Sequence, residues 1–278
     1  MKPLYEKYRP HKLDDVIGQE LAVKKLRLVL SKDGVRGNCF WISGPSGVGK
    51  TTLARILAGE IADGPYVTEI DATDATPARW QSIEYDMHYY GMGKGGRAYI
   101  VNESHGLRRD AIRQLLVLME RLPKHVCLIF TTSKTAKVQG LLFDDRSDAH
   151  PLLGRCLRID LVGAGTAEAF SARCYEIAEM EELRGSATMD DFRDLADKHQ
   201  GSLRGMLQDV AAGTMLFLDE EPVIKPEECE DHVCGAVMAD GRICNSPVTR
   251  ANGRCGIHSL YRSKHEHNLH SRVHACTA

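Results

Sequence analysis

A glycine-rich segment between an apolar run and a helix-forming run carries the clearest chemistry in the sequence. Its spacing is G-x-x-x-x-G-K-T; it follows residues 39–42 and precedes residues 52–58. Glycines let the backbone wrap an anion, so that successive N–H groups and the next helix N-terminus face phosphate groups. A lysine at this spacing reaches the β- and γ-phosphates of a nucleotide, and the hydroxyl after it coordinates Mg²⁺. The residues predicted to bind a nucleoside triphosphate are Gly44, Pro45, Ser46, Gly47, Val48, Gly49, Lys50, Thr51 and Thr52, with Thr51 as the Mg²⁺ ligand.

A second chemical signal follows directly after the apolar run 97–101. Asn102 and Glu103 stand where an ATPase with such a phosphate-binding loop (P-loop) usually has Asp-Glu. Glu103 is predicted to polarise the attacking water. Asn102 accepts a hydrogen bond from metal-bound water but supplies no charge to the ion. We therefore expect ATP binding to survive better than ATP turnover; the alternative is a polar strand end with no catalytic task.

Composition bounds the class of protein. The 278 residues are 43% apolar and 27% charged, which is ordinary for a globular protein. No apolar run approaches the ~18 residues of a membrane span, and the first five residues lack a signal-peptide core. The expected location is the cytoplasm, with the nucleoid or the cytoplasm of a virus-infected host as further settings.

The C-terminal segment differs from the rest. Residues 232–278 hold six Lys or Arg and two acidic residues, although the whole chain has a net charge of −2. Five of the nine cysteines fall within the last 50 residues, and in a reducing compartment such clustering favours a metal over disulfides. Three thiolates and an imidazole suit tetrahedral Zn²⁺. The predicted zinc ligands are Cys234, Cys244, Cys255 and His258, with Cys229 as a possible substitute and a tail of free cysteines as the alternative.

The pattern along the chain predicts an α/β fold. Strand-like runs at 39–42, 66–70, 97–101 and 126–131 alternate with amphipathic helices, which favours a parallel sheet. Residues 166–217 read as helices alone, and residues 219–231 have the acidic, proline-containing composition of a linker. The predicted domains are 1–163 (P-loop domain), 164–218 (helical lid), 219–231 (acidic linker) and 232–278 (zinc-binding module and basic, His-rich tail).

Residues 1–217 resemble the AAA+ clamp-loader group, which includes replication factor C small subunits, the bacterial DNA polymerase III gamma/tau subunit and the related RuvB motor. The likeness rests on the opening at 5–20, on 69–73, on 102–107 with 111–123, on 130–133, on 153–156 and on 201–204. It implies a AAA+ parallel-sheet domain with a helical lid. It also implies roles for single residues: Thr132 as sensor 1, Arg155 as an arginine finger for a neighbouring subunit's ATP, Arg204 as the sensor 2 contact to the γ-phosphate, and Tyr8, Arg9, Pro10, Val16 and Ile17 packing over adenine.

The resemblance implies ATP-dependent loading of a sliding clamp at primer–template junctions in DNA replication. It implies ATP and Mg²⁺ as ligands, and double-stranded or primer–template DNA, a sliding clamp and other loader subunits as partners. The chain departs from the family at Asn102 and at Gly154, lacks a cysteine-rich insert after the P-loop helix, and has after residue 217 a segment that does not read as the family's collar domain. Two alternatives stay open: a structural subunit that binds ATP without hydrolysing it, and a nucleic-acid adaptor whose zinc module recognises the target while ATP acts as a switch.

Overall fold

The computed structural model describes residues 2–32, 34–134 and 149–217. The chain divides into two units, Met1–Asp219 and Glu220–Ala278. The second unit lies outside the described residues, so the predicted zinc ligands Cys234, Cys244, Cys255 and His258 do too. In the described part of the chain, no helix has the length and apolar character needed to cross a membrane.

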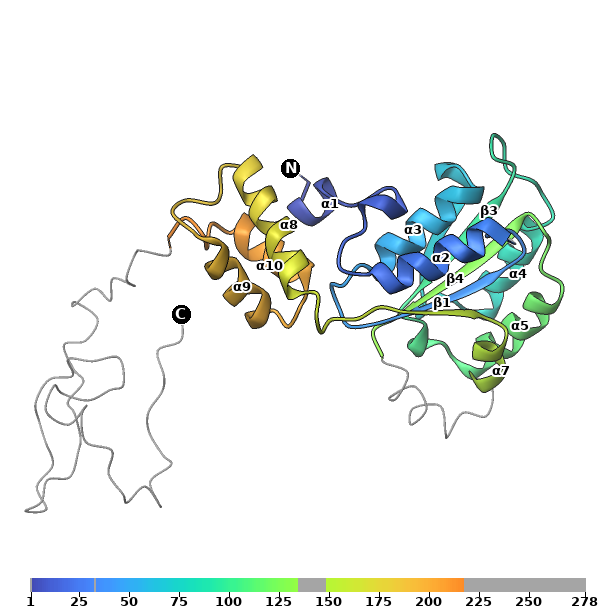
Figure 1. Cartoon of the computed structure of the whole chain (residues 1–278). Coiled ribbons are helices and arrows are strands. Elements are labelled where there is room, and N and C mark those ends of the chain that lie inside the picture. The colour runs from blue at the N-terminus through green and yellow to red at the C-terminus, as the bar shows by residue number, and fades with distance from the viewer. Residues whose placement is uncertain (1, 33, 135–148, 218–278) are drawn as a thin grey trace, which may run out of the picture. The chain divides into compact units, whose positions relative to one another are not determined.

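Five parallel strands form one sheet (Figure 1), and their order across the sheet is β2-β3-β4-β1-β5. They are β1 (Cys39–Ser43), β2 (Val67–Asp71), β3 (Arg97–Asn102), β4 (Val126–Thr132) and β5 (Leu157–Asp160). The first four were predicted. β2 begins one residue later than expected, because Gly64–Tyr66 forms a short 3₁₀ turn containing proline. The α/β prediction is confirmed for this part of the chain.

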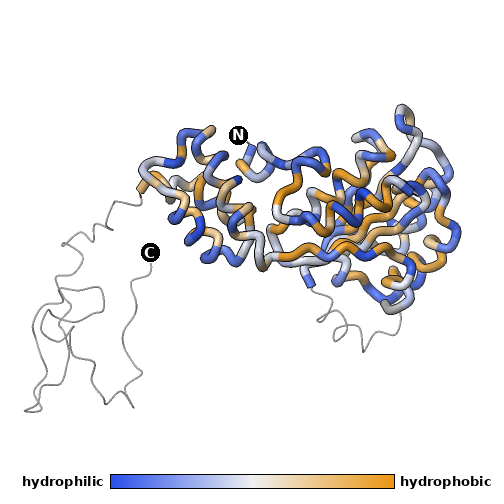
Figure 2. Tube along the Cα trace, in the orientation of Figure 1, coloured by the Kyte–Doolittle hydropathy of each residue, from blue (hydrophilic) through white to orange (hydrophobic). Residues whose placement is uncertain are grey.

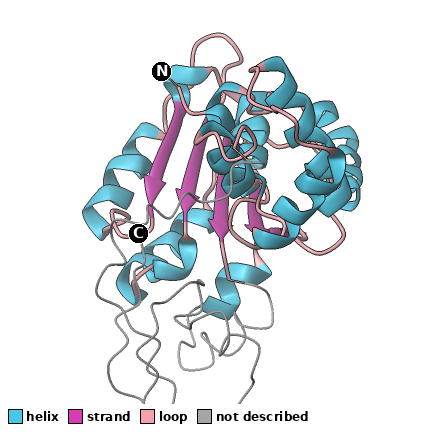
Figure 3. Cartoon of the chain, turned by 90° about the vertical axis from the view of Figure 1, so that its left-hand side faces the viewer, coloured by secondary structure: helices cyan, strands magenta, loops and turns pink. Residues whose placement is uncertain are grey.

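Helices cover both faces of the sheet (Figure 3). Helices α2 (Glu20–Lys32) and α3 (Lys50–Ile61) pack on one face, while α4 (Pro77–Asp86), α5 (Arg109–Glu120) and α7 (Ala149–Gly154) belong to the core of the other. Short turns complete this part: α1 (Leu4–Lys7) and the 3₁₀ turns Leu13–Asp15 and Ser104–Gly106.

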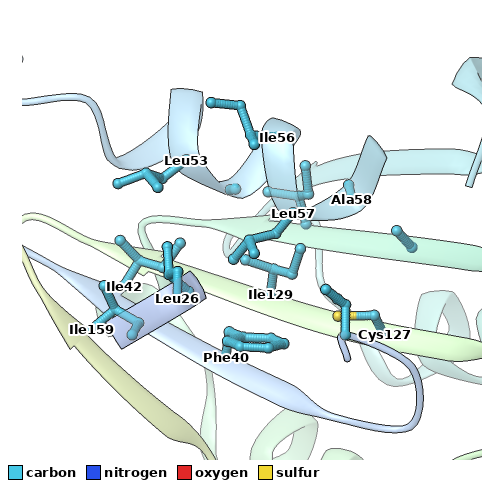
Figure 4. Packing of buried hydrophobic residues seen from close by; sticks show 14 of the residues in the cluster. Leu26, Phe40, Ile42, Leu53, Ile56, Leu57, Ala58, Cys127, Ile129 and Ile159 are labelled. Atoms are coloured by element: carbon cyan, nitrogen blue, oxygen red, sulfur yellow. The ribbon is translucent and has the colours of Figure 1, made fainter. Parts of the chain in front are cut away.

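Strand β1 shows how the sequence builds these two layers. Side chains alternate between the faces of a strand, so Phe40 and Ile42 pack with α2 and α3, whereas Cys39 and Trp41 pack in the opposite layer. All five residues of β1 are buried, which explains why the strand reads as a continuous apolar run. Figure 4 shows Leu53 and Leu57 of α3 directed at this face of the sheet. Figure 2 shows the same apolar strands lying between more polar helices.

Three helices follow the sheet: α8 (Ala167–Met180), α9 (Met189–Lys198) and α10 (Leu203–Ala211). They have a core of their own, built around Phe170, Phe192 and Met206, and this core also takes in Leu4 from the N-terminal helix. Ser202 caps α10, because its hydroxyl accepts a hydrogen bond from Gly205 N at 3.3 Å. The lid therefore packs against the N-terminal helix α1.

Candidate nucleotide site

The P-loop connects the carboxyl end of β1 to the first residue of α3. Its backbone takes left-handed conformations at Gly47, with φ of 80°, and at Gly49, with φ of 104°. L-residues with a side chain rarely adopt these values, so the glycine spacing is a requirement of the turn. The turn aims the unpaired N–H groups of a 12-residue helix at one point, which is the geometry that binds phosphate.

Lys50 is only 6% exposed, and its amine is fixed within the loop. Nζ donates hydrogen bonds to the carbonyl oxygens of Gly44 at 3.0 Å and Pro45 at 2.7 Å. Burial lowers the pKa of Lys50 below its usual value; the charge of Glu103 acts against this shift, and Arg204 adds to it. Glu103 at the end of β3 and Arg204 in the lid therefore both lie near enough for their charges to act on the Lys50 amine.

Thr51 and Asn102 meet where α3 begins beside β3 and β4. The Thr51 hydroxyl donates to Asn102 Oδ1 at 3.4 Å, and the Thr131 hydroxyl donates to the same oxygen at 2.9 Å. Sequence reasoning selected Thr132, which is fully buried and lies 3.2 Å from His105 Nδ1 instead. Thr131 was missed. The alternation of side chains along a strand could have predicted it, because Ile129 packs under α3 and Thr131 lies on the same face of β4.

Glu103 stands at a sharp change of chain direction, with φ of 49°. Its Oε2 accepts hydrogen bonds from Ser133 N at 3.1 Å and from Ser133 Oγ at 2.7 Å. His105 Nδ1 is 3.3 Å away. The carboxylate is about half exposed and so can reach solvent. Ser133 is a second residue that sequence reasoning passed over, because the contact joins the ends of two strands that are distant in the chain.

The donor set fits a nucleotide with Mg²⁺. Mg²⁺ prefers oxygen ligands; the Thr51 hydroxyl lies 3.4 Å from the Asn102 carbonyl oxygen, and the Glu103 carboxylate is near enough for its charge to act on Lys50. The cradle beside them accepts no side chain: a Cβ added at Gly47 would come within 2.9 Å of the Cβ of Ser202. The residues present can therefore hold a triphosphate and its ion.

The N-terminal segment that was predicted to pack over adenine bridges the two cores. Val16 packs against the core under α3, and Ile17 packs against the lid core, as does Tyr8. Arg9 is nearly buried and donates to the Thr52 hydroxyl at 2.9 Å. Pro10 is half-buried beside it. These residues thus lie between the P-loop helix and the lid.

The lid brings Arg204 toward the P-loop. Arg204 is the second residue of α10, and its guanidinium carbon lies 5.4 Å from the ring centre of Tyr5. Its charge contributes to the lowered pKa of Lys50 and also acts on Glu6. An exposed cation at this place can contact an anion held by the loop.

Arg155 lies elsewhere. Its Nη2 donates to Glu120 Oε1 at 2.7 Å and its Nη1 to the carbonyl of Pro151 at 3.1 Å. It precedes the amino end of β5, whereas the P-loop follows the carboxyl end of β1, and these two strands are parallel neighbours. Arg155 and the P-loop therefore lie at opposite ends of the parallel strands.

Comparison with known proteins identifies the relatives of this chain. Residues 8–77 match the family described as the Holliday junction DNA helicase RuvB P-loop domain. The chain is 29% identical over 160 residues to DNA polymerase III subunit gamma/tau of Mycobacterium tuberculosis, which covers 49% of this chain and 28% of the relative. It is 33% identical over 142 residues to the replication factor C small subunit of Methanothermobacter thermautotrophicus, which covers 49% of this chain and 43% of the relative. The chain thus spans less than half the length of these two relatives.

Solved structures give the same fold. A RuvB structure from Thermotoga maritima is similar with a TM-score of 0.61 and 22% sequence identity, over 77% of this chain and 68% of that one. A relative found by sequence covers most of the chain. The replication factor C small subunit of Natronomonas pharaonis is 25% identical over 286 residues, which covers 96% of this chain and 83% of the relative. The resemblance expected from the motifs is confirmed by these matches.

Proposed function

We propose that this chain, which is similar to clamp-loader subunits and to RuvB, binds ATP at the P-loop and hydrolyses it to drive remodelling at DNA. One observation carries the proposal. The Lys50 amine and the Thr51 hydroxyl come from the start of α3, the Asn102 carbonyl and the Glu103 carboxylate come from the carboxyl end of β3, and all four lie at the same end of the sheet. This is the set of groups that phosphoryl transfer to water needs.

Each residue has a task in this proposal. The P-loop amides and Lys50 hold the phosphates, and Thr51 with Asn102 orients the oxygens that surround the metal. Bound Mg²⁺ supplies neutralisation of the charge that develops on the phosphate oxygens. Glu103 accepts a hydrogen bond from the attacking water and aligns it, and Arg204 binds the γ-phosphate from the lid. We assign the sensor 1 role to Thr131 and not to the neighbouring Thr132, because the Thr131 hydroxyl donates to Asn102 Oδ1.

Arg155 completes the site of a neighbouring copy or partner subunit in this proposal. Its position at the end of the strands opposite the P-loop supports a contact in trans. An arginine supplied in trans stabilises transition-state charge and is worth about 10³–10⁵ in turnover in the systems where it is best known. Hydrolysis would then depend on assembly, which suits a machine that acts only when its partners are present.

The first test is steady-state ATP hydrolysis by the purified chain, with and without primer–template DNA. We expect hydrolysis that DNA stimulates and that Lys50→Ala abolishes. Lys24→Ala is the matched control, because it removes an exposed lysine from α2 and should leave the rate unchanged. Equal rates in the native chain and in Lys50→Ala would contradict the proposal.

The concrete task we propose is loading a sliding clamp at primer–template junctions, together with other subunits. The relatives named for DNA polymerase III and replication factor C support it. Deleting residues 229–278 separates this task from the adaptor alternative. On the clamp-loader proposal DNA binding survives the deletion, whereas on the adaptor alternative it is lost.

A second candidate function rests on Asn102. Because an amide brings no charge to the metal, the chain could hold ATP as a structural subunit and offer Arg155 to an active partner. Tight binding of Mg²⁺-ATP together with no turnover of its own, and a raised rate in a partner mixture, would favour this candidate.

We also propose that the C-terminal segment binds one Zn²⁺ through Cys234, Cys244, Cys255 and His258. Three thiolates and an imidazole are a frequent structural zinc set, and a segment this short needs such a staple to fold. Metal analysis of the full chain should find one zinc per chain, and Cys244→Ser should lower this value. An unchanged value near zero in both proteins would rule the site out.

A further inference from the structure

Asn102 is held between a carboxylate on one side and two hydroxyls on the other. Its Nδ2 donates to Glu69 Oε1 at 2.6 Å, and its Oδ1 accepts from Thr131 at 2.9 Å and from Thr51 at 3.4 Å. Glu69 belongs to β2 and Asn102 to β3, which are adjacent parallel strands. The amide therefore has three partners, drawn from the neighbouring strands and the P-loop helix.

The two sides of this arrangement differ in what they specify. An amide has one acceptor end and one donor end, and a hydroxyl can satisfy either of them. The hydroxyls of Thr51 and Thr131 alone would allow both orientations of the Asn102 side chain. A carboxylate only accepts, so Glu69 requires Nδ2 on its own side. The oxygen of Asn102 must then face Thr51.

Glu69 is itself oriented by α3. Arg55 Nε donates to Glu69 Oε2 at 2.9 Å, and Arg55 stands one helical turn after Thr51. Arg55 also lies 3.6 Å from Glu6. One oxygen of the Glu69 carboxylate is thus engaged by Arg55, while the other meets Asn102.

We propose that Glu69 is a positioning residue that makes Asn102 present its carbonyl oxygen, rather than its amino group, on the side of Thr51 where Mg²⁺ would be held. This rests on the proposed function, since it concerns the ion of the nucleotide site. The role matters because Asn102 is not symmetric. An Asp at the same position has two equivalent oxygens and would need no such partner.

A double-mutant cycle tests this, with the Mg²⁺ dependence of nucleotide binding as its readout. The binding of a fluorescent ATP analogue is titrated with MgCl₂ for the native chain, Glu69→Gln, Asn102→Asp and the double variant. Glutamine offers a donor as well as an acceptor, so Glu69→Gln permits both orientations of Asn102. We expect this change to raise the Mg²⁺ concentration at half-maximal binding about fivefold, the effect of losing one oriented hydrogen bond. In the Asn102→Asp background the same change should not raise it, because Asp presents an oxygen either way and Glu69→Gln removes the repulsion between two adjacent carboxylates.

Two further variants serve as a control for charge and as a second test. Asp71→Asn removes the same charge from the same strand and should leave the Mg²⁺ dependence within about twofold of the native value. Arg55→Ala releases the Glu69 carboxylate, and a smaller shift in the same direction is expected; it serves as the second test if Glu69→Gln fails to fold. Thermal unfolding of each variant separates a local change from a loss of the fold.

The possible outcomes separate the role of Glu69 from the proposed function. Native Mg²⁺-dependent binding that Glu69→Gln leaves unchanged would overturn the role of Glu69 but not the proposed function. Equal weakening in both backgrounds would also overturn it, since Glu69 would then act by its charge and not by orienting an amide. A native chain that binds no nucleotide would overturn the proposed function, and this assignment with it.

Discussion

Gly47 of the P-loop lies directly against Ser202, the residue that caps the lid helix α10. A Cβ at position 47 would fall within 2.9 Å of the Ser202 Cβ and closer still to its hydroxyl. A second contact lies beside it, since a Cβ at Gly163 would meet Pro45 Cγ at 3.2 Å. The lid therefore touches the loop that is predicted to hold phosphate, and we expect phosphate binding there to depend on the position of α10.

Gly47→Ala should damage the site in two ways. The φ of 80° costs an L-residue about 1–2 kcal/mol, and the added methyl group displaces Ser202. We expect nucleotide affinity to fall at least about tenfold, measured by titration with a fluorescent ATP analogue. Gly59→Ala is the control: this glycine lies within α3 with open space around it, and the change should raise the melting temperature.

A double variant separates the two causes. Gly47→Ala with Ser202→Gly removes the two shortest contacts of the added methyl group but keeps the backbone strain, so it should recover part of the lost affinity. No recovery at all would show that the lid contact does not matter for binding.

Glu103→Gln should separate binding from turnover. The amide keeps the size of the side chain but no longer accepts a proton or polarises water as a carboxylate does. We expect kcat for ATP hydrolysis to fall by about 10²–10⁴, with nucleotide affinity changed little. A loss of affinity as large as the loss of kcat would instead mean that Glu103 acts mainly through its charge on Lys50.

Arg155→Ala should lower hydrolysis without lowering nucleotide affinity, because Arg155 and the P-loop lie at opposite ends of the parallel strands. If copies of this chain complement one another, mixing Arg155→Ala with Lys50→Ala should restore part of the activity. In such a mixture the Lys50→Ala chain supplies Arg155, and its neighbour supplies an intact P-loop. Arg158→Ala, at an exposed position on β5, is the control and should retain the native rate.

The sequence predicted the P-loop, four strands and an all-helical lid, because each depends on a local pattern of residue types. It did not predict β5, where Leu157, Arg158 and Asp160 are all exposed and the apolar signal is weak. Thr131, Ser133 and Glu69 were also missed as members of the site. Their roles depend on strand register and on contacts between distant segments, which spacing along the chain does not specify.

The ion pairs of Asp209 predict how the lid responds to acid. Its Oδ2 accepts a hydrogen bond from Lys198 Nζ at 2.8 Å and lies 2.9 Å from His199 Nε2, so it ties α10 to the end of α9. The hydrogen bond from Lys198 lowers the pKa of Asp209 below its usual value; burial opposes this shift and His199 supports it. A carboxylate with a lowered pKa in the folded state stabilises the protein above the unfolded value of 3.8 and loses that contribution as pH falls through the folded pKa.

Asp209→Asn should therefore destabilise the chain at pH 7 by about 0.5–1 kcal/mol, a modest figure because the pair is partly exposed to solvent. The difference from the native chain should shrink as the pH falls below the unfolded pKa of 3.8 and toward the lowered pKa of Asp209 in the folded chain. Urea unfolding at pH 7, 4 and 3 measures it. Asp194→Asn, at an exposed position on α9, should show no comparable difference at pH 7. A deficit in Asp209→Asn that stayed the same at pH 3 would mean that the side chain stabilises the lid by packing and not by its charge.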